Sequence, residues 1–344
     1  MTPRERDILL KVTELYIETG EPVGSRTLQK RYSMDISPAT IRNVMADLED
    51  KGFLFQPHTS AGRLPTDEGI KYYINYLLFS IGEVDTGITT QLIDYLKSSK
   101  KYSFEEIFNA VLKFLTKSTG YVSLGISFAT DALIVKEISM VNVASSKVLI
   151  IIACEPDYVI HQIYPVNIET ALLAKISREL TSRFKGKSLA VVRKELVDEI
   201  NRIQNEFIEL SFTLKSQILK MVNSVNDVKV TGTSNIFNVI DDDLEKLQKI
   251  IKILEEKKTL LKTFEKLIDT TDKITVILGT ETDIEALSPF SIVAAKYSVR
   301  SKEAGLVGIM GPKRMDYCKI IPVVENVSKA LSHILSKSNN NQVL

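Results

Sequence analysis

The chain has 344 residues, of which 44% are hydrophobic and 25% are charged, and its net charge is +1. This length predicts two or three domains, and the composition is that of an ordinary globular protein. The near-zero charge excludes a protein that binds nucleic acid through overall positive charge. Residues 1–79 contain 10 Lys and Arg against 11 Asp and Glu, so any attraction to phosphate must come from the placement of a few cations.

The sequence gives no sign of secretion or of a membrane segment. Cys154 and Cys318 lie in apolar contexts and form no disulfide framework, which fits a reducing cytosol. The N-terminal MTPRERDILL lacks the apolar core of a signal peptide. The longest uncharged apolar run, Val148–Cys154, is too short to cross a bilayer. We therefore expect a soluble, cytoplasmic protein.

The first part of the chain predicts two helices and a turn. Thr2 and Pro3 begin a helix that runs through Thr19 and ends at Gly20. A short helix over Ser25–Arg31 follows, and the turn Ser33–Ile36 leads to a third helix. Two helices joined by a brief turn to a third are the order of a helix-turn-helix.

The third helix has two different faces. Ser37 can cap it and Pro38 suits its first position. Its buried stripe, at helical spacing, consists of Ile41, Val44, Met45 and Leu48. Thr40, Arg42 and Asn43 remain outside, and these side-chain types can contact base edges in a major groove. We predict that these three residues read bases.

A β-hairpin follows the third helix. Gly52 ends the helix, Phe53–Phe55 and Gly62–Leu64 are the predicted strands, and Thr66 begins a fourth helix that continues to Phe79. The tip between the strands is small and polar, which allows close approach to phosphate or a minor groove. The predicted contacts to the DNA backbone are Arg26, Thr27, Lys30, Ser37, His58, Thr59, Ser60 and Arg63.

The middle of the chain predicts strands rich in β-branched residues. After a linker around 80–90 and a helical stretch to Lys117, the predicted strands are Tyr121–Phe128, Leu133–Val143, Lys147–Ala153 and Tyr158–Val166. The simplest pairing is one antiparallel meander.

A long apolar stripe then runs from Leu189 to Met221, recurring every three or four residues. As one helix or two helices in line it would be about 50 Å long. Two interpretations remain open: the stripe packs inside its own domain, or it forms a subunit interface. The residues expected at such a dimer interface are Ile203, Phe207, Leu210, Leu214 and Ile218.

The C-terminal part returns to alternating helices and strands. A helix over Asp241–Ile268 precedes strands at Ile274–Leu278, Phe290–Tyr297 and Leu306–Met310, and a last helix spans Cys318–Leu335. We therefore expect a multidomain α+β protein. Its predicted divisions are an N-terminal domain over 1–80, an α/β domain over 81–165 and 226–344, and a mainly helical insertion over 166–225.

The sequence predicts no enzyme. The three histidines, His58, His161 and His333, lie on unrelated segments, and no metal-ligand or nucleophile motif is present. The glycines between Gly305 and Lys313 have the wrong spacing for a phosphate loop, and a buried strand with its turn explains them better. We expect neither a metal nor a cofactor.

Three motifs resemble those of one family. The segments SPATIRN and HTSAGRLPT near the N-terminus and GPKRMDY near the C-terminus are similar, in sequence and order, to the heat-inducible transcription repressors of the HrcA family. The resemblance runs over the whole length and is weakest in the middle. The family more often has Thr where this chain has Lys313.

This resemblance implies a specific architecture and function. It implies an N-terminal winged helix-turn-helix, a GAF-like domain and a dimerisation domain inserted into the latter. It further implies a homodimeric repressor that binds double-stranded DNA at an inverted-repeat operator of heat-shock chaperone operons, with the GroE chaperonin as the partner that maintains its activity. A small-molecule ligand of the GAF-like domain is not expected. A ligand sensor and an enzyme remain as alternatives from other classes.

Overall fold

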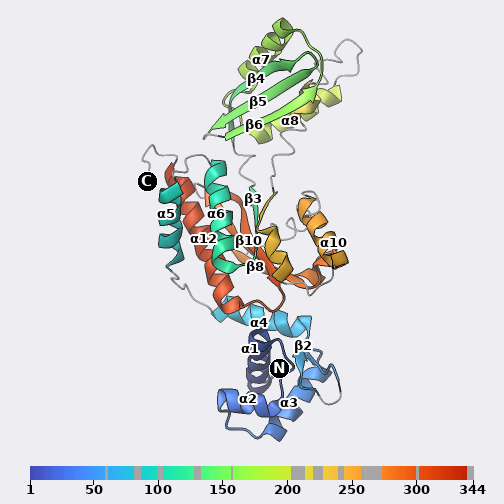
Figure 1. The fold of residues 1–344 in the computed structure, drawn as a ribbon. Helices are drawn as coiled ribbons and strands as arrows, with labels where there is room; N and C mark the ends of the chain where they lie inside the picture. Colours follow the sequence, from blue (N-terminus) through green and yellow to red (C-terminus); the bar gives the residue numbers. More distant parts are fainter. Residues whose placement is uncertain are drawn as a thin grey trace.

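The computed structural model consists of three packed units that follow one another along the length of the molecule (Figure 1). It describes residues 1–58, 61–80, 87–99, 104–127, 133–155, 158–202, 214–219, 228–238, 244–256, 260, 273–299 and 302–338. The N-terminal unit lies at one end of the molecule, a five-stranded sheet with its helices lies in the middle, and a three-stranded sheet lies at the other end. The predicted multidomain α+β class is confirmed.

The N-terminal unit is built from capped helices and a short hairpin. In chain order its elements are α1 (Pro3–Thr19), α2 (Ser25–Tyr32), α3 (Pro38–Asp50), β1 (Leu54–Phe55), β2 (Leu64–Pro65) and α4 (Asp67–Ser80). The Thr2 hydroxyl accepts from the Glu5 amide and the Glu5 carboxylate accepts from the Thr2 amide, which forms a capping box. Gly20 ends α1 in the left-handed conformation, at φ 76°. The predicted helices and the hairpin are therefore present.

One hydrophobic core holds α1, α2, α3 and the hairpin together. Its buried members are Ile8, Leu9, Val12, Leu15, Val23, Leu28, Ile41, Met45, Leu48 and Leu54. An ion pair of 2.8 Å between Glu5 and Lys51 also joins the start of α1 to the end of α3. The hydrogen bond from Lys51 lowers the pKa of the Glu5 carboxyl, so this pair stabilises the unit at neutral pH and is lost on acidification.

The middle unit is an antiparallel sheet with the strand order β7-β3-β10-β9-β8. Its strands are β3 (Val122–Ser127), β7 (Val228–Thr231), β8 (Ile274–Leu278), β9 (Phe290–Val299) and β10 (Lys302–Pro312). One face packs on α5 (Ile88–Ser99), α6 (Phe104–Thr119) and α12 (Tyr317–Ser338), and the other packs on α10 (Leu244–Glu255). Alternate residues of β9 follow this division, since Val293 faces the first core and Ile292 the second.

The glycines of β10 permit close packing within this sheet. A Cβ at Gly305 would lie 2.0 Å from the Ile126 carbonyl oxygen, and one at Gly308 would lie 2.4 Å from that of Val293. The interpretation of Gly305–Gly311 as part of a buried strand and its turn is thereby confirmed.

The third unit has a sheet of its own. The strands β4 (Ile134–Ala144), β5 (Lys147–Glu155) and β6 (Tyr158–Pro165) form a meander that shares one core with α7 (Thr170–Phe184) and α8 (Leu189–Arg202). The expected four-stranded meander is wrong at its first strand, because β3 pairs with β10 and β7 instead. The predicted boundary at residue 166 is also misplaced, since it divides strands and helices that share this core.

The long apolar stripe is described only in part. Helix α8 is described as far as Arg202, and the predicted interface residues Ile203, Phe207 and Leu210 lie outside the described residues. Leu214 and Ile218 are fully buried in the core with β4–β6. For these two positions the prediction of a subunit interface is wrong, because their side chains already pack inside their own unit.

Candidate nucleic-acid interface

Helix α3 presents the two faces that its sequence predicts. The Ser37 hydroxyl accepts a hydrogen bond of 3.1 Å from the Thr40 amide and so caps the helix. Ile41, Met45 and Leu48 are buried, and Val44 is half-buried. On the outer face Ala39, Arg42 and Asn43 are exposed and Thr40 is half-buried, with its hydroxyl 2.9 Å from that of Ser37. The predicted base-reading residues thus lie on one turn of one helix.

Helix α2 places the predicted phosphate contacts beside this face. Leu28 is buried against α1 and α3, which leaves Arg26, Thr27 and Lys30 exposed. The turn between α2 and α3 passes through Ser33 at φ 46° and is held by a 3.0 Å hydrogen bond from the Gln29 side-chain Nε2 to the Ile36 carbonyl. This geometry fixes α2 relative to α3.

Some cations of the N-terminal unit form ion pairs and others do not. Four of its cations form ion pairs within the unit, in the pairs Lys11–Asp7, Arg31–Glu18, Lys51–Glu5 and Arg63–Glu49. Among the described residues, none forms an ion pair with Arg26, Lys30 or Arg42. Four of the unit's acids are thus paired with other cations, and Arg26, Lys30 and Arg42 remain on α2 and α3 without an ion-pair partner among the described residues. A near-neutral unit can in this way attract an anionic partner locally.

The hairpin is attached to the end of α3 by Glu49. One carboxylate oxygen accepts a 3.1 Å bond from the Gln56 amide, and the other lies 2.8 Å from Arg63 Nε. The Arg63 side chain is only 17% exposed. The prediction that Arg63 holds DNA phosphate is not supported by this arrangement, because its charge is already paired and its guanidinium braces the hairpin.

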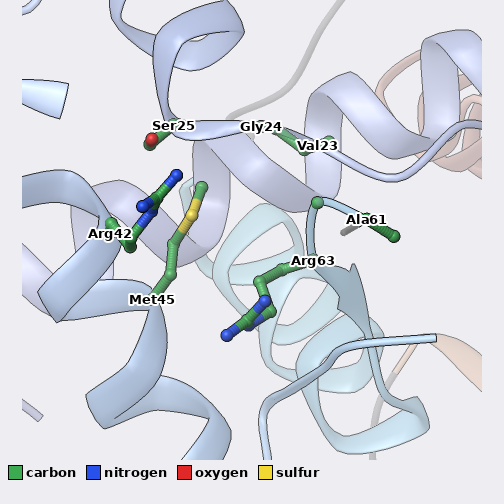
Figure 2. A pocket seen from close by; sticks show the side chains of 8 residues that line it. Val23, Gly24, Ser25, Arg42, Met45, Ala61 and Arg63 are labelled. Atoms are coloured by element: carbon green, nitrogen blue, oxygen red, sulfur yellow. The ribbon is translucent and has the colours of Figure 1, made fainter. Parts of the chain in front are cut away.

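The hairpin also packs against the loop before α2. Val23 and Arg63 exchange backbone hydrogen bonds of 2.9 Å, and a Cβ at Gly62 would lie 2.4 Å from the Val23 carbonyl carbon. A small pocket of about 130 Å³ remains between the loop, the hairpin and α3. Figure 2 shows Arg42 and Met45 extending from α3 into this pocket, opposite Arg63.

The tip of the hairpin is only partly described. His58 is exposed, and its carbonyl accepts a 2.8 Å bond from the Ala61 amide. Thr59 and Ser60, which were predicted to contact the DNA backbone, lie outside the described residues. The Ser37 hydroxyl serves as a helix cap, and it is also exposed.

The described residues show neither a membrane-spanning helix nor a cluster of metal ligands. No helix in the described part of the chain is long and apolar enough to span a bilayer. No group of three or more His, Cys, Asp or Glu side chains gathers as a metal site within the described ranges. Free cations, an exposed Asn and small side chains on one helical surface are typical of a protein that binds nucleic acid.

Comparisons with known proteins identify the family. Residues 105–321 match the HrcA protein C-terminal domain. The heat-inducible transcription repressor HrcA of Thermodesulfovibrio yellowstonii is 34% identical over 346 residues, which cover 97% of each chain. The repressor of the same name from Carboxydothermus hydrogenoformans is 33% identical over 345 residues, 98% of each chain. The chain belongs to the HrcA family.

A solved structure shares the fold. The crystal structure of a protein described only as hypothetical, at 2.2 Å resolution, matches this chain with a TM-score of 0.64 and 23% sequence identity. The match covers 98% of this chain and 99% of that one.

Glu49→Ala tests the attachment of the hairpin. The substitution removes the acceptor of Gln56 N and the partner of Arg63, so we expect the unit to lose about 1–3 kcal/mol of stability. Glu18→Ala is the matched control, because it breaks an exposed pair with Arg31 and should cost about 0–1 kcal/mol. Scanning calorimetry measures both. Equal, small losses would show that Glu49 does not brace the hairpin.

Proposed function

We propose that this protein is a dimeric transcription repressor that binds an inverted-repeat operator in double-stranded DNA. The observation that carries the proposal is the set of unpaired, exposed cations on α2 and α3 around the exposed Asn43. The names of the curated relatives, heat-inducible transcription repressors, support the same conclusion. We further propose, from the resemblance of its motifs to the HrcA family, that the regulated genes are heat-shock chaperone operons and that the GroE chaperonin maintains the activity.

In this proposal the N-terminal unit acts as a winged helix-turn-helix. The N-terminal half of α3 enters the major groove, where Thr40, Arg42 and Asn43 contact base edges. Arg26, Thr27 and Lys30 on α2 hold the adjacent phosphates, and the tip around His58 lies against the backbone as the wing. Arg63 acts indirectly, because it keeps the wing in position through Glu49.

The proposed dimer needs a surface other than Leu214 and Ile218. The sheet β4–β6 buries one face in its own core, whereas Val141, Val159 and Ile163 on the other face are 50%, 56% and 53% exposed. Val141 and Ile163 flank Leu149 directly across the strands, so an apolar patch crosses all three strands. Exposed patches of this kind mark interaction surfaces. We propose that two copies of this face meet in the dimer, with the middle unit serving as the GAF-like domain.

We call the N-terminal unit, which carries α2 and α3, the reading head. The two copies of the chain in a dimer together supply the affinity for DNA that a single reading head lacks. Three cations per copy give a small electrostatic footprint, because each phosphate contact contributes only one counterion release. Linking two heads makes the second binding event intramolecular and raises the overall affinity. Dimerisation and DNA binding are therefore parts of one proposal.

Arg42→Ala tests base reading by α3. We expect binding to an inverted repeat, selected from random duplexes with the wild-type protein, to weaken by about 1–3 kcal/mol and base preference to relax at one position. Arg178→Ala, on α7, removes an exposed Arg far along the chain and should leave binding unchanged. A gel-shift titration measures both. Wild-type affinity and base preference in Arg42→Ala would remove α3 from the reading surface.

Lys30→Ala and Arg31→Ala compare an unpaired cation of α2 with a paired one. Lys30 has no ion-pair partner among the described residues, whereas Arg31 is paired with Glu18 at 3.0 Å. Loss of Lys30 should reduce the slope of log affinity against log salt by about 0.9 for each half-site, because one phosphate contact disappears. Loss of Arg31 should change the slope little. Identical salt dependence in the two variants would contradict the assignment.

Ile163→Asp tests the dimer surface. A carboxylate on the apolar face of β4–β6 should yield monomers in sedimentation velocity, because an unpaired charge is costly to bury. Val191→Asp is the comparison, since Val191 is 42% exposed on α8, outside the sheet. If only Val191→Asp gives monomers, the interface lies on the helices instead.

A further inference from the structure

Helix α4 belongs to two units at once. At its N-terminus the Thr66 hydroxyl donates a 2.6 Å bond to the Gly52 carbonyl, and the Thr66 amide donates a 3.0 Å bond to that of Phe53. A Cβ at Gly69 would lie 2.3 Å from the Phe53 carbonyl oxygen, so the helix and the hairpin backbone touch. The first turn of α4 is therefore fixed to the N-terminal unit.

The remainder of α4 is part of the middle unit. Ile70, Tyr73, Ile74 and Leu77 are buried in the core that α12 and the five-stranded sheet form. Leu10, Tyr16 and Ile17 of α1 also pack against this core. The predicted domain boundary at residue 80 thus falls after a helix that already packs in the second unit. Apolar packing keeps the units in contact, but it is not directional.

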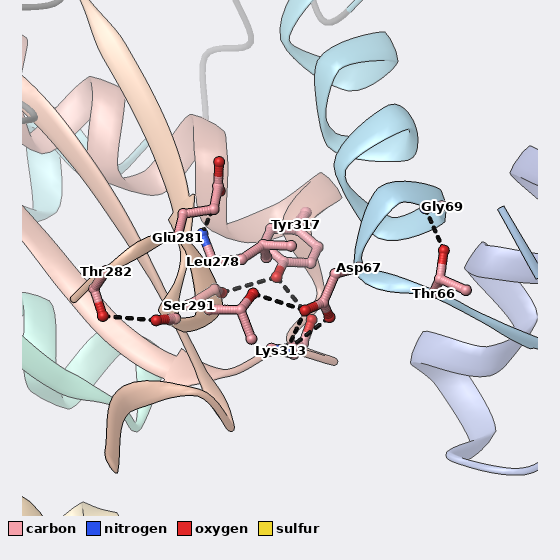
Figure 3. A network of polar contacts seen from close by, with 11 residues as sticks. Thr66, Asp67, Gly69, Leu278, Glu281, Thr282, Ser291, Lys313 and Tyr317 are labelled. Carbon is pink, nitrogen blue, oxygen red and sulfur yellow. Dashed lines mark hydrogen bonds and ion pairs between the residues drawn. The ribbon is translucent and has the colours of Figure 1, made fainter. Parts of the chain in front are cut away.

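A directional contact lies at the start of α4 (Figure 3). Lys313 Nζ donates to both carboxylate oxygens of Asp67, at 2.6 and 2.8 Å, and the Thr280 hydroxyl donates to Asp67 Oδ2 at 2.7 Å. The Lys313 side chain is 21% exposed and that of Asp67 39%. Three charge-assisted hydrogen bonds on one carboxylate fix its position more narrowly than a single exposed ion pair would. We call Asp67, Thr280 and Lys313 the Asp67 joint.

The partners of Asp67 are themselves anchored in the middle unit. The backbone carbonyl of Lys313 accepts a 2.7 Å bond from the Tyr317 hydroxyl, which also lies 2.8 Å from the buried Ser291 hydroxyl. Thr280 is next to Glu281, whose carboxylate accepts a 2.9 Å bond from the Leu278 amide and also pairs with Lys71 of α4. The joint therefore connects the N-terminal unit to residues that are hydrogen-bonded within the middle unit.

A second contact follows along the same loop. The Arg314 guanidinium lies against Gly20 at the end of α1, because a Cβ at Gly20 would be 2.6 Å from its Nη1. Residues 313 and 314 thus touch α4 and α1, the two helices of the N-terminal unit that face the middle unit.

We infer that the Asp67 joint sets the orientation of the reading head relative to the rest of the chain. Asp67 and Lys313 are then positioning residues, because the orientation that they set determines which spacing between operator half-sites the dimer prefers. The inference rests on the proposed function for its DNA part alone. In a dimer held together far from the heads, the angle of each head determines the half-site spacing that both can reach. A looser joint should leave the reading of one half-site intact and weaken only the preference for spacing.

The orientation can be measured without DNA. Spin labels at Asp35→Cys, an exposed position of the N-terminal unit, and at Asp94→Cys on α5 report the distance between the units. All labelled proteins also carry Cys318→Ser, so that the label does not attach at this position. Cys154 can stay, because burial raises the pKa of its thiol to about 12 and keeps it unreactive. To separate distances within a chain from those between chains, labelled protein is mixed with an excess of unlabelled protein. Pulsed electron–electron double resonance then gives the distribution of distances between the two labels.

The expected result is a single narrow distance in the otherwise wild-type chain and a broader or shifted distribution in Lys313→Met and Asp67→Asn. Lys319→Met is the matched control, because it removes a Lys of the same segment whose exposed pair with Asp316 lies outside the joint. Distributions of the same width and mean in all four proteins would overturn the inference. Since this readout needs no DNA, it stands independently of the proposed function.

The consequence for DNA is measured with a set of duplexes. They carry the inverted repeat selected with wild-type protein, the same repeat with its spacer changed in single-base-pair steps, and one half-site alone. We expect Lys313→Met and Asp67→Asn to reduce discrimination between spacers by about tenfold and to bind the single half-site as the wild type does. Equal loss on all duplexes would overturn the positioning role. Failure of the wild-type protein to select any repeat would instead refute the proposed function.

Discussion

The start of α4 constrains the whole arrangement, because one turn of helix packs against two units. Gly69 leaves no space for a side chain against the Phe53 carbonyl, and Asp67, two residues earlier, accepts hydrogen bonds from Lys313 and Thr280. The apolar stripe that begins at Ile70 continues into the core of the five-stranded sheet. The hairpin, the third helix and the middle unit are therefore positioned relative to one another by the same few residues.

Charge placement connects this scaffold to function. A chain with a net charge of +1 has no general attraction for DNA. Within its N-terminal unit some acids form local pairs, such as those of Glu18 with Arg31 and Glu49 with Arg63. Arg26 and Lys30 of α2 and Arg42 of α3 form no such pair among the described residues. Small, placed charge of this kind favours reading a specific site over non-specific coating of DNA.

Local features of the site could be predicted from sequence, whereas its long-range contacts could not. Ser37, Pro38 and the apolar spacing of α3 predicted the helix and its outer face, because capping and periodicity act within a few residues. The pairing of Arg63 with Glu49 depends on how the hairpin folds back, which composition does not report. In the fold, strand positions were predictable but their sheets were not: β3 and β4 are neighbours in sequence and belong to different sheets. The burial of Leu214 shows the same limit, since an apolar stripe does not reveal which surface covers it. Lys313 stood out in the sequence because it departs from the motif of the resembled family. That it contacts Asp67 could be learned only from the fold.

The proposed function depends on contact between the outer surface of α2 and α3 and operator DNA. This contact can be measured by hydrogen–deuterium exchange with mass spectrometry, with and without the selected inverted-repeat duplex. DNA should slow exchange in the peptides that cover residues 25–46 and the hairpin tip, and should leave those of α10 and β8 unchanged. Slowed exchange in the middle unit, with no change across α2 and α3, would show that the DNA binds elsewhere.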